Sequence, residues 1–101
     1  MDRTVTIQEL IVTVNELTVS DVRDWLKSMS EREDFDIVNA GLFKAENCTI
    51  DDLLFMTDID KAELDQLTPT QIILIIDKAK KVNPHFFALR AMIVENAHQS
   101  I

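Results

Sequence analysis

Glycine, proline and cysteine are scarce in this sequence, and each scarcity narrows the range of folds and functions. The 101 residues include one glycine, two prolines and one cysteine. A β-sandwich needs a turn signal about every 8–12 residues, so a chain with so few turn residues is expected to be mainly helical. Loops that cradle phosphate groups need glycines, so no nucleotide-binding loop is expected. A single cysteine, Cys48, excludes an internal disulfide.

Long apolar runs are also missing. No segment approaches the roughly 20 consecutive apolar residues that a membrane-spanning helix requires. The first residues, Met1-Asp2-Arg3-Thr4, do not show the basic stretch and apolar segment of a secretory signal. We therefore expect that residues 1–101 form one domain that neither spans a membrane nor is exported.

Positive charge is in the minority. Ten lysines and arginines stand against eighteen aspartates and glutamates, which gives a formal net charge of −8. Nucleic acid binding requires clustered basic side chains that release counterions. The one basic cluster, Lys78, Lys80 and Lys81, is explained more simply as the last turn of a helix, where cations meet the negative end of the helix dipole. Nucleic acid is therefore not an expected partner.

The acidic residues do not form a recognisable metal site. The densest stretch is Asp58, Asp60, Glu63 and Asp65. An EF-hand loop that began at Asp58 would need a ligand at its fifth position and a glycine at its sixth, where Ala62 and Glu63 stand. Acids in the first turn of a helix are the better interpretation, and no metal or other cofactor is expected.

Catalytic equipment is missing as well. His85 and His98 have no Cys or acid at ligand spacing, although zinc needs three or four converging ligands. Cys48 lacks an evident base to activate it, and the sequence contains neither a Gly-x-Ser-x-Gly nor a His-Glu-x-x-His motif. We expect a protein that is not an enzyme.

Residues 4–15 fit two structures. Their apolar residues alternate as in a strand, with a phase slip near Gln8-Glu9, but Ile7, Leu10, Ile11 and Val14 also have helical spacing. The many β-branched residues favour a short ribbon or bent strand.

Helix start signals follow from Thr18 onward. Each is a Thr or Asp followed three residues later by an acid, as in a capping box: Thr18 with Asp21, Thr49 with Asp52, and Asp60 with Glu63. The first helix is expected to bury a face made of Val19, Val22, Trp25, Leu26 and Met29. A second short helix is expected at Ile37, Val38, Leu42 and Phe43.

The two prolines give the sharpest signals. Thr68-Pro69 and Asn83-Pro84 each place a capping side chain before a proline at the first helical position, which predicts helices at 69–82 and 84–98. The expected fold is therefore mainly α, a compact single domain of five or six short helices with a short β element at the N-terminus.

Both of these last helices have more apolar residues than one buried stripe needs. Ile72 to Ile76 are consecutive apolar residues, and the helix at 84–98 has one stripe with Phe86, Leu89 and Ile93 beside another with Phe87, Ala91 and Val94. The excess has two interpretations: these helices lie at the centre of the core, or one of their apolar faces is a docking surface for another protein. The candidate protein-binding residues are Ile73, Leu74, Phe86, Phe87, Ala91 and Val94.

Several short motifs resemble, in the same order, those of the tail assembly chaperones of long-tailed bacteriophages. They are Glu16-Leu17-Thr18-Val19, Val22-Arg23, Trp25-Leu26, Leu54, Met56-Thr57-Asp58-Ile59, Leu67-Thr68-Pro69 and Val82-Asn83-Pro84-His85-Phe86-Phe87. The resemblance covers roughly residues 16–90. It implies a protein of the host cytoplasm, absent from the mature virion, that binds the tape measure protein, helps to recruit tail tube protein and self-associates.

A second resemblance is to SAM domains, five-helix modules that bind each other. It comes from the segment Val22–Leu26 with Trp25, from Leu42-Phe43, Ile50, Leu53-Leu54 and Leu64, and from the isoleucine-rich helix. SAM domains usually open their last helix with a glycine and a basic residue, where Thr68-Pro69-Thr70-Gln71 stands here. They also have no place for a helix after Asn83-Pro84, so the chaperone resemblance is the stronger one.

Overall fold

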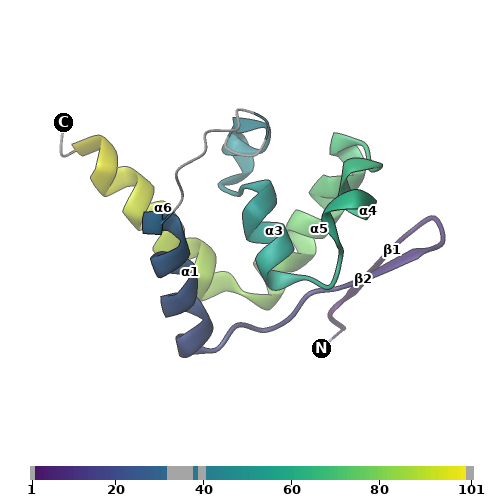
Figure 1. Ribbon diagram of the computed structural model, residues 1–101, viewed down its shortest axis with the longest axis horizontal. Coiled ribbons are helices and arrows are strands. Elements are labelled where there is room, and N and C mark those ends of the chain that lie inside the picture. Colours follow the sequence, from purple (N-terminus) through teal and green to yellow (C-terminus); the bar gives the residue numbers. More distant parts are fainter. Residues whose placement is uncertain (1, 32–37, 39–40, 100–101) are drawn as a thin grey trace.

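The fold is an N-terminal β-hairpin followed by a helical body (Figure 1). It is given by a computed structural model that describes residues 2–31, 38 and 41–99, with the backbone alone at 29–31 and 94–99. The elements are β1 (Thr4–Ile7), β2 (Leu10–Thr13), α1 (Val19–Glu31), η1 (Lys44–Glu46), α3 (Ile50–Met56), α4 (Lys61–Asp65), α5 (Pro69–Val82) and α6 (Pro84–Gln99). The expected mainly α fold with an N-terminal β element is confirmed.

The hairpin explains the phase slip in the N-terminal pattern. β1 and β2 pair antiparallel with Ile7 opposite Leu10, so that Gln8 and Glu9 form a two-residue turn. Gln8 has a φ of 56°, in the left-handed region that such turns require and that glycine adopts most easily. Because of this turn, the apolar residues of β1 and those of β2 lie on the same face of the hairpin. Ile7 and Val12 on that face are both buried.

The loop between α3 and α4 pairs with the outer edge of β2. The Thr13 amide donates to Oδ1 of Asp58 at 2.8 Å, and the Asp58 amide donates to the Thr13 carbonyl at 3.2 Å. One step further, Val14 forms a β-bridge with Thr57. An unpaired strand edge invites association with other chains, and these contacts cover part of it.

Side chains cap α1, α3, α4 and α5 as the sequence predicts. In each of α3, α4 and α5 the capping box is complete, with both reciprocal hydrogen bonds present. Before α1, the Asp21 amide donates to the Thr18 hydroxyl and the Thr18 amide donates to the Asp21 carboxylate. These bonds satisfy backbone groups that a helix start otherwise leaves without partners, so the predicted starts are confirmed.

α5 is the central helix. It packs against β1, α3 and α6, and Ile72, Ile75, Ile76, Ala79 and Val82 are buried in the common core. In Figure 1 the hairpin lies at one end of the molecule, while α1 and the C-terminal part of α6 lie at the other.

The buried face of α1 is narrower than the sequence predicts. Trp25 is buried and Val22 is half-buried, but Val19 is 72% exposed and Leu26 is exposed too. The expectation that Val19 and Leu26 are buried is wrong, because α1 lies at the edge of the molecule and contacts it along one side (Figure 1). The side chain of Met29 lies outside the described residues.

The expected second helix falls mostly outside the described part of the chain. Of its region, Val38 and Gly41 are helical, and the Leu42 amide donates to the Val38 carbonyl at 3.1 Å. Phe43, the last apolar residue assigned to that helix, is buried and precedes η1.

Candidate docking groove between α1 and α6

The structure divides the six predicted binding residues into different environments. Leu74 is 50% exposed, Ala91 is exposed and Ile73 is half-buried against the core. Phe86 and Phe87 are only 3% and 7% exposed. Val94 belongs to α6, and its side chain is outside those described. The six residues therefore do not form one continuous exposed surface.

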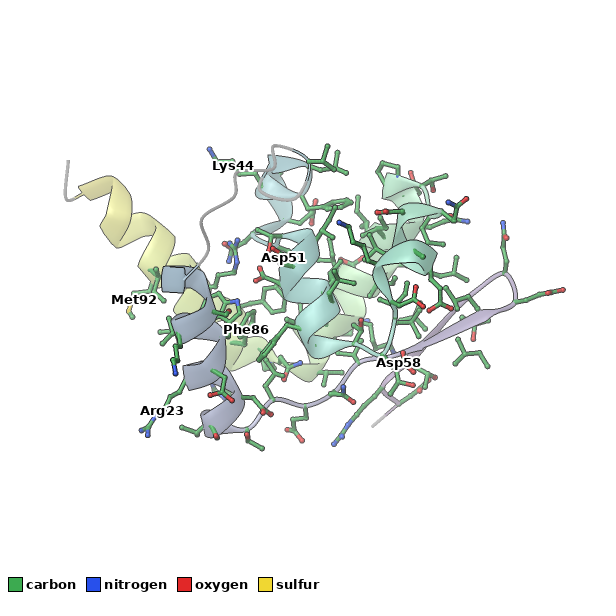
Figure 2. All side chains as sticks on the ribbon, viewed as in Figure 1. Arg23, Lys44, Asp51, Asp58, Phe86 and Met92 are labelled. Atoms are coloured by element: carbon green, nitrogen blue, oxygen red, sulfur yellow. The ribbon has the colours of Figure 1, made fainter. Side chains whose placement is uncertain are left out.

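The two phenylalanines belong to the core of this chain. Their rings meet edge to face with centroids 5.1 Å apart, and the Phe86 ring makes a similar contact with Trp25 at 4.7 Å. Figure 2 shows Phe86 between α1 and the rest of the body. The two stripes of α6 are thus both used for internal packing at the level of Phe86 and Phe87.

A groove of about 540 Å³ lies between the start of α1 and the junction of α5 and α6; we call it the α1–α6 groove. Its apolar lining consists of Leu17, Val19, Val22, Val82, Pro84 and Phe86, and its polar lining of Glu16, Thr18, Lys81, Asn83 and His85. Apolar walls with a few polar groups are typical of binding sites on proteins.

Asn83 fixes the two walls of the groove to each other. Its side-chain oxygen accepts a hydrogen bond from the Leu17 amide at 2.8 Å, and its side-chain nitrogen donates to the Asn15 carbonyl at 2.9 Å. The sequence predicts Asn83 as the cap of the next helix, but its buried carboxamide instead satisfies the backbone of the segment between β2 and α1. Sequence spacing carries no signal for this contact, because its partners lie 66 and 68 residues away.

Charged groups of both signs stand at the rim. Glu16 lies on the α1 side and forms an exposed ion pair with Arg3 at 3.1 Å. Lys81 and His85 are exposed on the opposite side, at the α5–α6 junction. The groove therefore has an apolar floor with the Lys81 ammonium on one side and the Glu16 carboxylate, paired with Arg3, on the other.

Behind the groove, Asp52 connects three helices. One carboxylate oxygen accepts from Nε1 of Trp25 on α1 at 2.7 Å, and the other accepts from Nε of Arg90 on α6 at 2.7 Å. The second oxygen also accepts from the Thr49 amide in the capping box of α3. The sequence identifies only this last role of Asp52, since capping is local and the other two contacts are not.

Asn47 completes the network. It follows η1 with a φ of 57°, a left-handed conformation that asparagine tolerates better than most residues. Its side-chain oxygen accepts from Nη1 of Arg90 at 2.7 Å, and its side-chain nitrogen donates to the Phe87 carbonyl at 3.2 Å. Among the described residues no buried side-chain nitrogen or oxygen lacks a hydrogen-bond partner.

The thiol of Cys48 is buried beside this network. Burial raises its pKa from the ordinary value of 9.0 to about 12, and the Asp52 carboxylate acts in the same direction. The thiol is therefore protonated at neutral pH, whereas a cysteine nucleophile reacts as the thiolate. Its environment is that of a core side chain.

Acidic side chains of the α3–α4 region accept hydrogen bonds from backbone amides. Asp58 accepts from the Thr13 amide, and Asp60 accepts from the Glu63 amide. In the part of the chain that the structure describes, no group of three or more His, Cys, Asp or Glu side chains is placed to hold a metal ion. No helix in that part is long and apolar enough to cross a membrane.

Comparisons with protein-family models, with curated proteins and with solved structures found no match. The function must therefore be inferred from the chain's own motifs and surface.

Proposed function

We propose that this protein is a tail assembly chaperone of a long-tailed phage, which binds the tape measure protein through the α1–α6 groove. One observation carries the proposal. Of the eleven residues that line the groove, ten belong to the motifs Glu16–Val19, Val22-Arg23 and Val82–Phe87, on which the resemblance to these chaperones depends. Motifs that lie some sixty residues apart in sequence thus meet at one surface.

The groove suits an apolar segment of a partner. Val19 protrudes from the start of α1 with most of its side chain exposed, and Leu17, Val82 and Pro84 line the hollow beside it. Exposed apolar surface beside polar groups is typical of protein interaction sites. An amphipathic helix of the tape measure protein is the occupant that we propose.

The net charge of −8 supports the same role. A chaperone that covers apolar segments must itself stay soluble, and a large net charge provides mutual repulsion between copies. Self-association of this chain would work against that repulsion, so that added salt should strengthen it. Recruitment of tail tube protein is the later step of the proposed role.

Co-expression with the tape measure protein of the same phage tests the proposal. The expected result is co-purification, together with a larger soluble fraction of tape measure protein than when it is expressed alone. If the two proteins do not co-purify and the tape measure protein is equally soluble alone, the chaperone role is rejected.

A SAM-like interaction module is the alternative. A five-helix module of that kind would end with the isoleucine-rich helix, here α5, and its core would not need α6. Instead α6 contributes Phe86 and Phe87 to the core, and Arg90 of α6 is hydrogen-bonded to α3 and to Asn47. The chaperone proposal is therefore the better supported of the two.

A further inference from the structure

Among the described side chains of α1, Trp25 makes the main contact with the core. Trp25 is the one fully buried side chain among them, and its indole N–H donates to Asp52. Val22 is half-buried, whereas Val19 and Leu26 are exposed. Since the described side chains of α1 bury little other apolar surface, the indole contacts are a large part of what holds the helix against the body. The bonds of Asn83 to Asn15 and Leu17 hold the segment just before it.

α6 beyond Phe87 depends on a similar contact. Leu89 and Ile93 are half-buried and Met92 is exposed, while Arg90 reaches Asp52 and Asn47 with two hydrogen bonds of 2.7 Å. The Asp52 and Arg90 side chains are 4% and 13% exposed. Residues 88–93 of α6 are thus held in place by a buried ion pair as much as by apolar packing.

We propose that Asp52, Trp25 and Arg90 form a latch that couples α1 to α6, so that both helices loosen together and open the α1–α6 groove. The two donors use different oxygens of one carboxylate, and the Trp25 ring also packs on Phe86 at the base of α6. Losing either donor leaves a buried carboxylate incompletely satisfied. A carboxylate that turns toward water to make up the missing bond leaves its place and so releases the other donor.

The latch controls access to the groove because its helices carry the walls. Val19 and Val22 of α1 form one wall, and Pro84 and Phe86 of α6 form part of the other. When α1 moves outward, the Trp25 and Phe86 rings become exposed and enlarge the apolar floor. This regulatory role depends on the proposed function, whereas the coupling of α1 to α6 is a property of the free chain.

Amide hydrogen exchange of the free protein tests the coupling. Two variants each remove one donor and keep most of the packing: Trp25→Phe on α1 and Arg90→Met on α6. Arg23→Met is the matched control, because Arg23 is exposed and points away from the body (Figure 2). Asp52→Asn is a further variant that keeps the side-chain shape but only one acceptor oxygen, whereas the indole and the Arg90 guanidinium use different oxygens.

Each substitution is expected to raise the exchange rate in the helix that does not carry it. Arg90→Met should accelerate exchange in α1, and Trp25→Phe should accelerate exchange in residues 87–93 of α6, each roughly tenfold or more. Asp52→Asn should accelerate both helices. In every variant, residues 72–80 of α5 should still exchange more slowly than either helix, and exchange in the Arg23→Met control should stay near wild type.

Two outcomes would overturn the latch. In one, each variant accelerates exchange only in its own helix. In the other, amides of α5 exchange as fast as those of α1 and α6 in wild type and variants, which means that the chain opens only as a whole. Because no partner is present, either result would leave the co-purification test of the proposed function unaffected.

Discussion

The guanidinium of Arg90 on α6 donates from Nε to Oδ2 of Asp52 on α3 at 2.7 Å, with both side chains largely buried. Desolvating two charges is costly, and their attraction repays the cost only when further hydrogen bonds complete their shells. Here Trp25, Thr49 and Asn47 supply those bonds. The pair therefore fixes where α6 lies more than it adds to stability.

Breaking the pair from one side should nevertheless be damaging. In Arg90→Met the Asp52 carboxylate stays buried without its cation, and we expect a loss of about 3 kcal/mol in the free energy of unfolding, the lower end of the range for buried pairs. Urea denaturation measures it. Arg23→Met should change stability by less than about 0.5 kcal/mol; equal losses in the two variants would contradict the buried role of Arg90.

Phe87 is expected to behave as a core residue. Because its side chain is 7% exposed, Phe87→Ser should lower the free energy of unfolding by about 3–5 kcal/mol and lower the melting temperature accordingly. Ala91→Ser, on the same stripe of α6 but exposed, should leave both nearly unchanged. A Phe87→Ser protein with the wild-type melting temperature and no association with partners would instead make this stripe the docking face.

The hairpin turn offers a stabilising substitution. Gln8 has a φ of 56°, which costs an L-residue about 1–2 kcal/mol. A glycine in its place would remove this strain at an entropic cost of about 0.5–1 kcal/mol, so Gln8→Gly should stabilise the protein by about 0.5–1 kcal/mol in urea denaturation. Glu9→Gly should be destabilising, since φ of Glu9 is not positive. Shifts of the same sign in both variants would rule out this account of the turn.

The local parts of this fold are those that the sequence predicts well. Capping boxes and prolines act within four residues, so the bounds of α5 and the start of α6 follow directly from Thr68-Pro69 and Asn83-Pro84. The β-branched residues before Val14 likewise favour the hairpin.

Where a side chain has both a local and a distant hydrogen-bond partner, the sequence predicts only the local one. Asn83 and Asp52 both appear as helix caps in the sequence, yet Asn83 bonds to the segment before α1 and Asp52 also bonds to Trp25 and Arg90. These contacts depend on how the helices pack, which residue spacing does not encode. The sequence does not predict the α1–α6 groove for the same reason. Val19 has the spacing of a buried residue of α1, and only the packing of the helices leaves it exposed at the groove.

Cys48 should resist labelling in the folded protein. Its thiol is buried, and its pKa is raised to about 12, so a thiol reagent at pH 8 should react only when the chain opens. Labelling should be slow in native buffer and fast in denaturant. The absorbance of the chromophore that the reagent releases measures both rates. A native rate equal to the denatured rate would show that Cys48 is accessible.

The same shift predicts a loss of stability at high pH. The folded state holds the thiol proton more tightly than the unfolded state, whose pKa is near 9.0. The stabilisation from Cys48 is therefore complete below pH 9 and is lost as pH rises from there toward 12. Cys48→Ala should show a smaller decline in melting temperature over this window than the wild type; equal declines would exclude Cys48 as a cause.

The central claim is that the α1–α6 groove binds a partner, and two matched substitutions separate it from the other exposed apolar surface. Val19→Asp places a charge at the mouth of the groove, at the first residue of α1, where an acid favours the helix. Leu74→Asp places the same charge on α5, at a residue that is also exposed and that the sequence itself marks for docking.

The most direct measurement is the amount of tape measure protein that co-purifies with wild type, Val19→Asp and Leu74→Asp, each first shown to be folded by its melting curve. Binding in the groove predicts that Val19→Asp loses most of the tape measure protein while Leu74→Asp retains a wild-type amount. Full retention by Val19→Asp, with or without loss in Leu74→Asp, would contradict it.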